Sequence, residues 1–533
     1  MDGLSADAVI LSMSTAEIKT FLTSTFLQNQ GSIMTTRTTP DHSPDQEVII
    51  IGAGFSGIGS AIKLSEIGIN DYLVLEQGDG IGGAWHFNTY PGVAVDIPSL
   101  SYSFSFERNP EWSRLFAPGA ELKAYAEHCV DKYHIRSRIR LNTGITAAVF
   151  DEAGDFWRLT TNSGDELTAR HVIGATGVLT QPKKPAIAGI DSFQGVTMHT
   201  ARWDHGVSLA GKRVAIIGTG ASALQVIPEI APEVKHLTVF QRTPIWVIPK
   251  PDFAIPAMAQ GMMKKVPLLQ VPARLISQAI VEVGFVLTAH YHGYVPLAKG
   301  YEKLALDHLQ KQVKDPVTRA KLTPHYGFGC KRPSASNTYW KAFNRDNVAL
   351  VTEPIVEVVA NGVRTQDGQL HEIDILICAT GFKVFENGNM PPFSVTGLAG
   401  RDLEGWWDAN RYQAYEGVTV PAFPNFFMIL GPNGYNGASY FQLIEHQVRH
   451  IGRCLIQARK QGAKRIEVTQ AANDRYFRDM KARTGKQVFF NNSCTTANSY
   501  YFDKHGDVPF RPSTSIEAHL RSMTFAMSDY RFS

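Results

Sequence analysis

The chain has 533 residues, of which 44% are hydrophobic and 19% are charged, so it is long enough for two or three domains with substantial cores. Its formal net charge of +3 is small for this length, and no run of Lys and Arg stands out. These values exclude the strongly basic surface that is typical of nucleic-acid-binding proteins, so we expect no nucleic-acid partner.

The five cysteines are scattered along the chain and form no CxxC pair. An odd number without such spacing argues against a disulfide framework, a zinc site or a redox-active dithiol. We therefore expect no metal site and a reducing, cytoplasmic setting. These cysteines are Cys129, Cys330, Cys378, Cys454 and Cys494.

The N-terminus lacks the basic start, continuous apolar run and small-residue cleavage site of a secretory signal. The most hydrophobic stretch runs from Leu275 to Leu287, contains Glu282 and is only about a dozen residues long, whereas roughly 20 residues cross a bilayer. The sequence therefore predicts no transmembrane segment. It favours a buried or amphipathic helix, and peripheral membrane contact stays open as the alternative.

In chain order, residues 6–27 show loose helical periodicity, and residues 35–46 are polar and contain Thr, Pro and Asp. This pattern predicts an N-terminal extension and linker over residues 1–45. The folded part then opens with Val48–Ile51, a continuous apolar run that is typical of a strand buried on both faces of a parallel sheet.

A GxGxxG motif follows this strand directly and precedes a predicted helix over Ile58–Ile67. Its first glycine permits a tight turn, its second lets a pyrophosphate approach the backbone, and its third lets helix and strand pack closely. The next strand, Tyr72–Leu75, ends in Glu76, whose carboxylate can accept hydrogen bonds from ribose hydroxyls. This context favours a dinucleotide site over a chance glycine-rich turn. The motif glycines are Gly52, Gly54 and Gly57.

The chain carries an internal duplication, because Ile49–Gly57 (IIIGAGFSG) recurs 166 residues later as Ala215–Ala223 (AIIGTGASA). A second repeat relates Val172–Gly177 to Leu376–Gly381, and each is predicted to be a strand that ends in a glycine turn. The pattern predicts an α/β fold of two Rossmann-like dinucleotide-binding domains, with the second inserted into the first, so that the chain returns to the first sheet near residue 350. The predicted ranges are 46–190 for the first part of the first domain, 191–345 for the second domain with a helical insertion at about 250–330, and 346–533 for the second part of the first domain and a C-terminal tail.

The second motif follows the predicted strand Val214–Ile217. Its third glycine is replaced by Ala223, a change that the packing role tolerates. The charge of a later residue also differs: 24 residues after the first glycine, the first unit has Glu76 and the second has Arg242, next to Thr243. The second motif contains Gly218, Gly220 and Ser222.

A carboxylate at this position would repel a 2'-phosphate, whereas a guanidinium binds it through charge-assisted hydrogen bonds. The second site should therefore prefer NADP over NAD, unless Arg242 is a solvated surface residue. Two sites of different preference indicate a permanent redox cofactor beside a diffusing hydride donor, and FAD and NADPH are the natural pair. We assign FAD to the first domain and NADP to the inserted one. The stretch Gly80–Trp85, with Gly83 and Trp85, could pass close to a flat cofactor because its glycines have no Cβ.

Two further motifs resemble those of a known family. Phe193–Asp204 (FQGVTMHTARWD) matches every fixed position of FxGxxxHxxxW[P/D], the fingerprint of the type I Baeyer-Villiger monooxygenases. Gly82–Asp96 (GGAWHFNTYPGVAVD) looks like the family's second signature, GGxWxxxxYPGxxxD. Related N-oxygenating flavin monooxygenases usually lack the Trp and the Asp or Pro at the end of the fingerprint, so its last two residues favour the Baeyer-Villiger branch. The fingerprint residues are Phe193, Gly195, His199, Trp203 and Asp204.

The resemblance implies roles for single residues. The family's catalytic arginine corresponds to Arg332, and its active-site aspartate corresponds to Asp96. Lys331 looks like a 2'-phosphate contact, together with Arg242 and Thr243. His199 and Trp203 match residues that lie near the domain junction of the family and coordinate domain motion rather than touch the substrate. Without the resemblance, Asp96 could merely cap the turn at Pro98, and Arg332 could be one more loop cation.

The resemblance also implies a reaction. With FAD and NADPH, the chain would insert one oxygen atom from O2 next to a ketone carbonyl through a flavin C4a-peroxide and release an ester or lactone. Arg332 would stabilise the negative charge that develops on oxygen, and Asp96 would orient it. The alternative is an N- or S-oxygenating flavin monooxygenase, in which the peroxide attacks a soft nucleophile. A disulfide reductase is disfavoured because the chain has no CxxC pair.

Overall fold

The computed structural model describes residues 43–490 and 494–533. The chain divides into Met1–Ser43, almost all of which lies outside the described residues, and Pro44–Ser533, which contains both large sheets. The helical periodicity expected over residues 6–27 and most of the linker expected over residues 35–46 lie outside the described residues.

The first sheet forms around β1 (Gln46–Ile51), which pairs in parallel with β2 (Tyr72–Leu75) and β6 (Glu166–Gly174). Its strand order is β17-β4-β5-β6-β1-β2-β3, and β18 pairs with β6. β1 is buried on both faces as predicted, because alternate residues of the strand belong to two different hydrophobic clusters. The remaining strands are β3 (Ile139–Arg140), β4 (Ile145–Asp151), β5 (Phe156–Thr161), β17 (Ser394–Thr396) and β18 (Phe426–Met428).

Helices from both ends of the chain cover this sheet. α3 (Phe55–Glu66) begins within the first glycine motif, directly after its second glycine, and packs against α14 (Tyr440–Gln461). The rings of Phe55 and Phe441, whose centroids lie 4.6 Å apart, are part of this contact. The C-terminal segment therefore completes the first nucleotide-binding unit, which is built on the first sheet; the unit built on the second sheet is called the second unit. The other helices are α4 (Ala84–Phe87), α5 (Gly119–Lys132), α13 (Leu403–Asn410), α15 (Gln470–Thr484) and α16 (Ser515–Thr524), and β19 (Ile466–Val468) pairs with β20 (Tyr530–Phe532).

The second sheet has the order β12-β9-β8-β16-β7, and all of its pairings are parallel. Its middle strand, β8 (Arg213–Ile217), is also buried on both faces. The second sheet lies between β6 and β17 in the chain, which confirms an α/β fold in which one nucleotide-binding unit is inserted into another. The elements of this unit include β7 (Val196–His199), α6 (Ala221–Ile230), β9 (His236–Phe240), α12 (Tyr339–Ala342), β12 (Val348–Val351) and β16 (Ile375–Cys378), and two short strands, β10 (Val247–Ile248) and β11 (Ser334–Ala335), pair with each other.

The predicted return to the first sheet near residue 350 is wrong. β12 and β16 both pair in the second sheet, and the chain reaches the first sheet again only with β17. The repeat of Val172–Gly177 as Leu376–Gly381 explains why the chain stays in the second sheet, because β6 pairs with β1 in the first sheet just as β16 pairs with β8 in the second. Each unit thus has its own copy of this strand. Between β12 and β16 lies a small antiparallel sheet of β13 (Ile355–Val359), β14 (Gly362–Thr365) and β15 (Leu370–Glu372).

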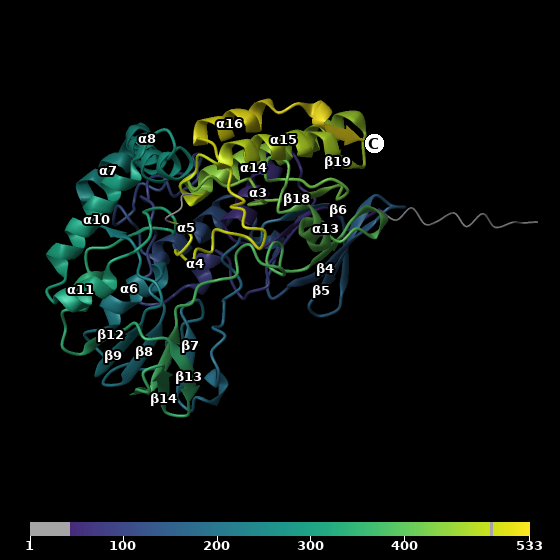
Figure 1. Ribbon diagram of the computed structural model, residues 1–533. Helices are drawn as coiled ribbons and strands as arrows, with labels where there is room; N and C mark the ends of the chain where they lie inside the picture. The colour runs from purple at the N-terminus through teal and green to yellow at the C-terminus, as the bar shows by residue number, and fades with distance from the viewer. Residues whose placement is uncertain (1–42, 491–493) are drawn as a thin grey trace, which may run out of the picture. The chain divides into compact units, whose positions relative to one another are not determined.

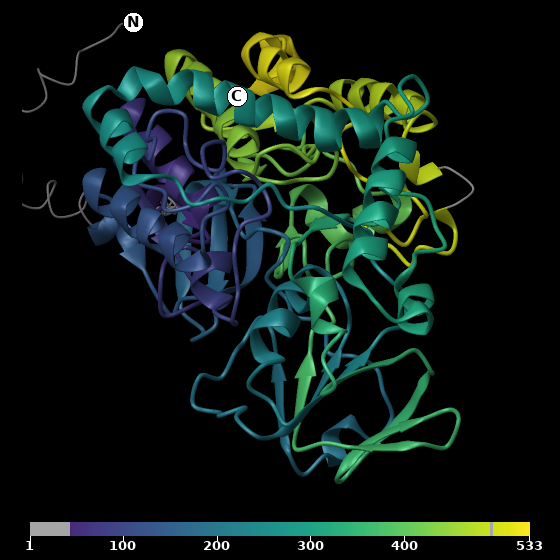
Figure 2. The same ribbon diagram turned by 90° about the vertical axis from the view of Figure 1, so that its left-hand side faces the viewer.

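The segment expected as a helical insertion, about residues 250–330, is mainly helical. Figure 1 shows its teal helices along one side of the two sheets, and Figure 2 turns that side toward the viewer. The stretch Pro267–His290 is long and apolar enough to cross a membrane, yet only 28% of its most apolar window is buried. Of the buried or amphipathic helix expected here, the buried form is not found, because most of this stretch lies at the surface. The helices are α7 (Ala257–Lys265), α8 (Gln270–Val281), the π-helix η4 (Glu282–Leu287), α9 (Thr288–His290), α10 (Ala298–Gln312) and α11 (Pro316–Leu322).

Candidate functional site

The loop after β1 turns so tightly that two of its positions have no room for a side chain. Gly52 has a φ of +110°, and a Cβ there would lie 2.6 Å from the carbonyl oxygen of Ala175. A Cβ on Gly57 would lie 1.8 Å from the carbonyl oxygen of Gly52. Both positions therefore require glycine. Because α3 begins at Phe55, its first N–H groups, which have no partner within the helix, are free to meet a phosphate.

We expect Gly57→Ala to abolish the retention of flavin, because the added methyl group would push α3 away from β1. The measurement is bound flavin per chain after purification, read from the visible absorbance, together with the midpoint of thermal unfolding. Gly261→Ala is the matched control, since a Cβ on Gly261 in α7 would meet no described atom within 4 Å. A Gly57→Ala protein that keeps its full flavin content would contradict this account of the loop.

Gly83 brings a second glycine-rich stretch against this motif. A Cβ on Gly83 would lie 3.0 Å from the Cα of Gly54, and the N–H of Gly82 donates to the carbonyl oxygen of Ala53 at 2.9 Å. Nearby, Trp85 in α4 packs edge-on against Tyr102, with ring centroids 5.8 Å apart. Bare backbone beside an aromatic side chain fits a flat cofactor, as the sequence predicts.

Glu76 follows β2 and reaches back to the first motif. Its buried carboxylate accepts hydrogen bonds from the N–H of Ala53 at 2.8 Å and from the N–H of Gly78 at 2.9 Å. These bonds hold the carboxylate beside the loop that would bind a pyrophosphate. Since each carboxylate oxygen can accept two hydrogen bonds, Glu76 keeps acceptor capacity for ribose hydroxyls.

The second motif repeats this geometry in the second sheet. Gly218 has a φ of +111°, and a Cβ there would lie 2.5 Å from the carbonyl oxygen of Ala379, which follows β16. A Cβ on Gly220 would meet no atom of the described residues within 4 Å, so there is open space beside this motif. Ser222 lies in the first turn of α6, where its hydroxyl partly opposes the burial that raises the pKa of Tyr90 to about 12.

Arg242 and Lys331 lie close together beside the second motif. The hydroxyl of Thr219 donates to the carbonyl oxygen of Thr243 at 3.1 Å, which ties the loop that carries Arg242 to the motif. Burial and the charge of Arg242 lower the pKa of Lys331 to about 8. The side-chain oxygen of Asn498 accepts hydrogen bonds from Nε and Nη2 of Arg242 at 2.9 and 2.8 Å. Two neighbouring cations suit a doubly charged phosphate, such as the 2'-phosphate of NADP.

The low pKa of Lys331 predicts how the binding of NADPH depends on pH. At neutral pH the ammonium group is charged, and it loses its proton as the pH rises through about 8, so its attraction to a phosphate is lost there. We expect the KM for NADPH to rise from about pH 8 upward while the KM for NADH stays flat, measured from about pH 7 to about pH 9.5. Lys331→Arg should remove this rise, because a guanidinium stays protonated. An identical rise in Lys331→Arg would assign the effect to another group.

Arg332 forms an ion pair with Asp96. Its Nε and Nη2 donate to Oδ2 of Asp96 at 2.9 and 2.5 Å. The side chains are 31% and 41% exposed, so a small molecule can reach the pair. The charge of Asp96 raises the pKa of Arg332 well above its usual value, which keeps the guanidinium protonated. The guanidinium therefore carries a fixed positive charge, which Asp96 partly offsets.

Tyrosines from the C-terminal part of the chain surround Arg332. Burial raises the pKa of Tyr501 well above its usual value, and the charge of Arg332 acts in the opposite direction. The Tyr501 hydroxyl is buried and has no hydrogen-bond partner among the residues that the structure describes. Tyr435 and Tyr500 also interact with the guanidinium. A buried hydroxyl without a partner beside a cation suits a polar ligand.

The segment that ends at Asp96 packs on the second unit. The Tyr90 hydroxyl donates to Oε1 of Gln225 at 2.9 Å, and Nε2 of Gln225 donates to the carbonyl oxygen of Ala94 at 2.9 Å. A Cβ on Gly92 would lie 2.8 Å from the carbonyl oxygen of Gln225. Gln225 belongs to α6, the helix that starts at the second motif, so Asp96 lies where the two nucleotide-binding units meet.

The fingerprint residues link β7 to the segment around α4. Nδ1 of His199 accepts a hydrogen bond from the N–H of Ala201 at 3.0 Å, and burial lowers the pKa of the imidazole. Nε2 of His199 is buried and unpaired within the described part of the chain. Trp203 packs against the core of the second sheet. Its neighbour Arg202 lies over the ring of Phe87 in α4 at 4.1 Å, so the fingerprint touches both units.

The other fingerprint residues shape the backbone. A Cβ on Gly195 would lie 2.3 Å from the carbonyl oxygen of Asp374 and 2.5 Å from the ring of Phe193, so this position requires glycine. Asp204 accepts a hydrogen bond from the N–H of Gly206 at 2.8 Å. Phe193 and Asp204 thus shape the backbone of the fingerprint itself.

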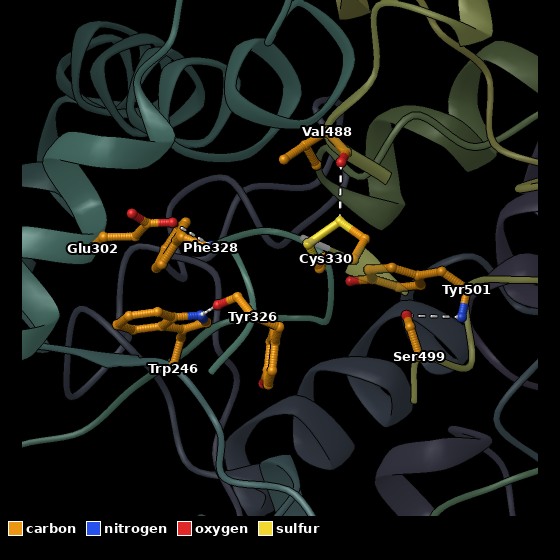
Figure 3. The surroundings of a disulfide bond; sticks show 9 residues. Trp246, Glu302, Tyr326, Phe328, Cys330, Val488, Ser499 and Tyr501 are labelled. Carbon is orange, nitrogen blue, oxygen red and sulfur yellow. Dashed lines mark hydrogen bonds between the residues drawn. A yellow bond between two sulfur atoms is a disulfide. The ribbon is translucent and has the colours of Figure 1, made fainter. Parts of the chain in front are cut away.

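Cys330 and Cys494 form a disulfide, with Cα atoms 5.1 Å apart (Figure 3). The expectation of unpaired cysteines is therefore wrong for this pair. The two residues are 164 positions apart, and only the tertiary structure brings them together. The other cysteines, Cys129, Cys378 and Cys454, are free and buried.

Sequence reasoning also missed the residues after Cys494 that face the site. Asn498 binds Arg242, and Tyr500 and Tyr501 lie beside Arg332. No motif marks them, and the C-terminal tail fell outside the fingerprints. The one available signal was the Tyr-Tyr pair itself, which is too common to point to a site.

Comparisons with known proteins cover nearly the whole described unit. A family model described as pyridine nucleotide-disulphide oxidoreductase matches residues 49–266. The chain is 39% identical over 469 residues to a Baeyer-Villiger monooxygenase of Pseudomonas aeruginosa, an alignment that covers 87% of this chain and 88% of that protein. It is 37% identical over 491 residues to a Baeyer-Villiger monooxygenase of Streptomyces coelicolor, with 91% and 92% covered.

Solved structures agree with these relatives. A crystal structure of OTEMO in complex with FAD and NADP superposes with a TM-score of 0.82 at 28% identity and covers 92% of this chain and 100% of that chain. A cyclohexanone monooxygenase from Rhodococcus sp. Phi1 bound to NADP+ also gives a TM-score of 0.82, at 30% identity, with 92% and 99% covered. The similarity therefore extends over both nucleotide-binding units.

Proposed function

Because this chain belongs to the Baeyer-Villiger monooxygenase family, we propose that it inserts one oxygen atom from O2 next to the carbonyl group of a ketone and releases an ester or a lactone. The chain is an NADPH-dependent flavin monooxygenase that uses FAD and NADP and acts on a small molecule together with O2. The resemblance of its two fingerprints to this family is thereby confirmed.

The observation that carries the proposal is the Arg332–Asp96 ion pair between the two nucleotide motifs. A carbonyl oxygen of the substrate gains negative charge when the carbonyl carbon is attacked, and a preorganised guanidinium stabilises that charge. Arg332 suits this task because it remains protonated and partly reachable. Asp96 holds its orientation and offsets its charge before the substrate binds.

The residues present fit both cofactors. A Cβ on Gly52 would collide with the backbone of Ala175, a Cβ on Gly83 would press on the backbone of Gly54, and the Glu76 carboxylate keeps acceptor capacity for a ribose. We assign FAD to this first unit, where the flavin, when bound, supplies the activation of O2. The chain's own part there is to hold the cofactor rigidly and to keep water away from it.

In the second unit, Arg242 and Lys331 hold the 2'-phosphate of NADPH in this proposal. The carbonyl group of Thr243, next to Arg242, ties this loop to the second motif. Lys331 precedes Arg332 in the chain. Binding of the phosphate therefore orders the backbone next to the guanidinium that faces the ketone. His199 and Trp203 act from the junction of the units as supports rather than as substrate contacts.

The test is product identification with a ketone and a thioether supplied side by side to the purified protein with FAD, NADPH and O2. An ester or lactone from the ketone, with NADPH consumed in equal amount, is the expected result. Sulfoxide without any ester would favour the S-oxygenating alternative, and NADPH consumption that yields only hydrogen peroxide with every ketone tried would argue against the proposal.

A further inference from the structure

The helix α8 exposes its apolar side. Leu275, Ile276 and Ile280 are 59%, 64% and 57% exposed. In a soluble surface helix such side chains face the core and polar ones face water. We call the exposed apolar side chains of α7, α8 and the turn between them the apolar ridge. Its most exposed members are Met258, Met262, Leu268, Leu275, Ile276 and Ile280.

The polar side chains of α8 face inward instead. Gln270, Arg274 and Ser277 share one face of the helix and are buried. Nη1 of Arg274 donates to the carbonyl oxygen of Leu100 at 3.1 Å, and the Ser277 hydroxyl donates to the hydroxyl of Ser101 at 2.9 Å. These bonds fix the rotation of the helix, so the apolar side cannot simply turn inward.

The exposed charged side chains of the segment that forms the apolar ridge are lysines, and the exposed Glu111 from another segment pairs with one of them. Between residues 253 and 281 the only exposed charged side chains are Lys264 and Lys265, and Lys264 also pairs with Glu111 at 2.7 Å. Beyond the far end of α8, Tyr294 is 68% exposed, and Nζ of Lys486 lies 5.4 Å from its ring centroid. Lysine and tyrosine at the edges of an apolar surface are typical of segments that lie in the headgroup region of a membrane.

We propose that the apolar ridge docks on the surface of an anionic lipid bilayer, without spanning it. Leu, Ile and Met would enter the acyl boundary, and the lysines would meet anionic headgroups. A protein partner fits less well, because protein interfaces are depleted in Lys and anchored mainly by Trp, Tyr and Arg, none of which is among the exposed side chains of the ridge, whereas its methionines suit either partner. Figure 2 shows the teal helices of this segment along the face that is turned toward the viewer.

The test is cosedimentation of the FAD-loaded protein with vesicles of phosphatidylcholine and phosphatidylglycerol, and with vesicles of phosphatidylcholine alone. We expect clear binding to the first kind, weakened roughly 100-fold by the triple change Leu275→Asn, Ile276→Asn and Ile280→Asn. The double change Lys264→Gln and Lys265→Gln should weaken it roughly 30-fold. Val356→Asn is the control, because Val356 is 53% exposed but lies on β13 in the second unit.

Binding that is absent, or equal for all variants, would overturn the proposal. Self-association in analytical ultracentrifugation that the triple change abolishes, without any vesicle binding, would assign the ridge to a second copy of this chain. Because these side chains are exposed, the variants should keep their flavin and melting temperature, so loss of binding is separable from loss of folding.

A separate observation concerns the disulfide. On one side of it, the Trp246 indole donates to the carbonyl oxygen of Tyr326 at 2.8 Å, and the N–H of Phe328 donates to Glu302 at 2.9 Å (Figure 3). The loop that leads to Cys330 is thus held firmly by the second unit. On the other side, Cys494 begins the segment that carries Asn498, which binds Arg242.

We infer that the Cys330–Cys494 disulfide is a positioning pair that holds Asn498 against Arg242 and so raises the preference for the phosphorylated nicotinamide. This inference rests on the proposed NADP site. Reduction by a dithiol transfers two electrons and two protons to the S–S bond, which gives two thiols and leaves the dithiol as its own disulfide. Without the disulfide, the segment that follows Cys494 has to be ordered when NADP binds, and this ordering lowers the affinity for NADP.

The test compares the dissociation constants of NADP+ and NAD+ for the flavin-loaded protein. We expect Cys494→Ala to weaken NADP+ binding roughly threefold to tenfold and to leave NAD+ binding unchanged. Cys454→Ala, a buried free cysteine on α14, is the matched control. Treatment of the unchanged protein with dithiothreitol should reproduce the effect of Cys494→Ala, which covers the case that this variant folds poorly.

Thiol counting in denaturant gives an independent readout. We expect three reactive thiols before reduction, from Cys129, Cys378 and Cys454. Five thiols in the untreated protein would show that the bond does not form and would overturn the inference, as would equal weakening of NADP+ and NAD+. An unchanged protein that binds no NADP+ at all would instead contradict the proposed function.

Discussion

Arg332→Ala is expected to reduce ester formation by about 10² to 10³ in rate while NADPH still reduces the flavin. The guanidinium is the positive charge that Asp96 binds directly, and Ala at this position leaves no group to stabilise a developing oxyanion there. Hydride transfer needs the 2'-phosphate contacts and the bound flavin, which the substitution leaves in place. The measurement is anaerobic flavin reduction by absorbance, with ester yield per NADPH consumed under O2.

The control for this experiment is Arg345→Ala, an exposed arginine after α12. It should leave both the reduction and the ester yield unchanged. Asp96→Asn should keep the flavin bound but lower the ester yield, because the amide no longer offsets or orients the guanidinium. If Arg332→Ala makes ester at the rate of the unchanged protein, Arg332 has no part in the oxygen transfer.

Arg242→Ala is expected to raise the KM for NADPH roughly 10-fold to 100-fold and to leave the KM for NADH nearly unchanged. Hydrogen bonds from a guanidinium to a phosphate are charge-assisted, and NADH lacks the 2'-phosphate that would receive them. The measurement is steady-state kinetics with both nicotinamides at one ionic strength, since salt screens this attraction.

Two results would count against this assignment. An equal rise of both KM values would mean that Arg242 supports the fold of the loop and not the phosphate. A KM for NADPH that does not change would leave Arg242 as a surface residue bound to Asn498. Lys331→Met tests the same phosphate site independently, because Lys331 lies close enough to Arg242 for their charges to interact. Its effect should fall on NADPH alone as well.

The two nucleotide-binding units were predictable because their signals are local. Gly52 and Gly218 both have φ near +110°, and each faces the carbonyl oxygen of the residue after a neighbouring strand. Such a turn needs glycine wherever it occurs, so it leaves a short glycine motif that can be recognised in the sequence. Glu76 and Arg242 could be read in the same way, because each stands at a fixed distance after its motif.

The predicted domain boundary failed for a related reason. The strands β12 and β16 look like any buried parallel strand, and nothing in their residues says which sheet they join. Pairing of parallel strands is decided by the crossover connections and the cores on both faces. The return to the first sheet therefore had to be seen in the tertiary structure.

By itself, the sequence determined the presence of two dinucleotide-binding folds, their charge preference and their family, because tight turns and spaced motifs depend on neighbouring residues. The pairing of Arg332 with Asp96, 236 positions away, was expected only through the family resemblance, and the tertiary structure supplied the contact itself; it alone decided that Cys330 meets Cys494. It also decided that α8 turns its polar side inward. Contacts of this kind depend on how many side chains pack at once, and no short stretch of residues specifies them.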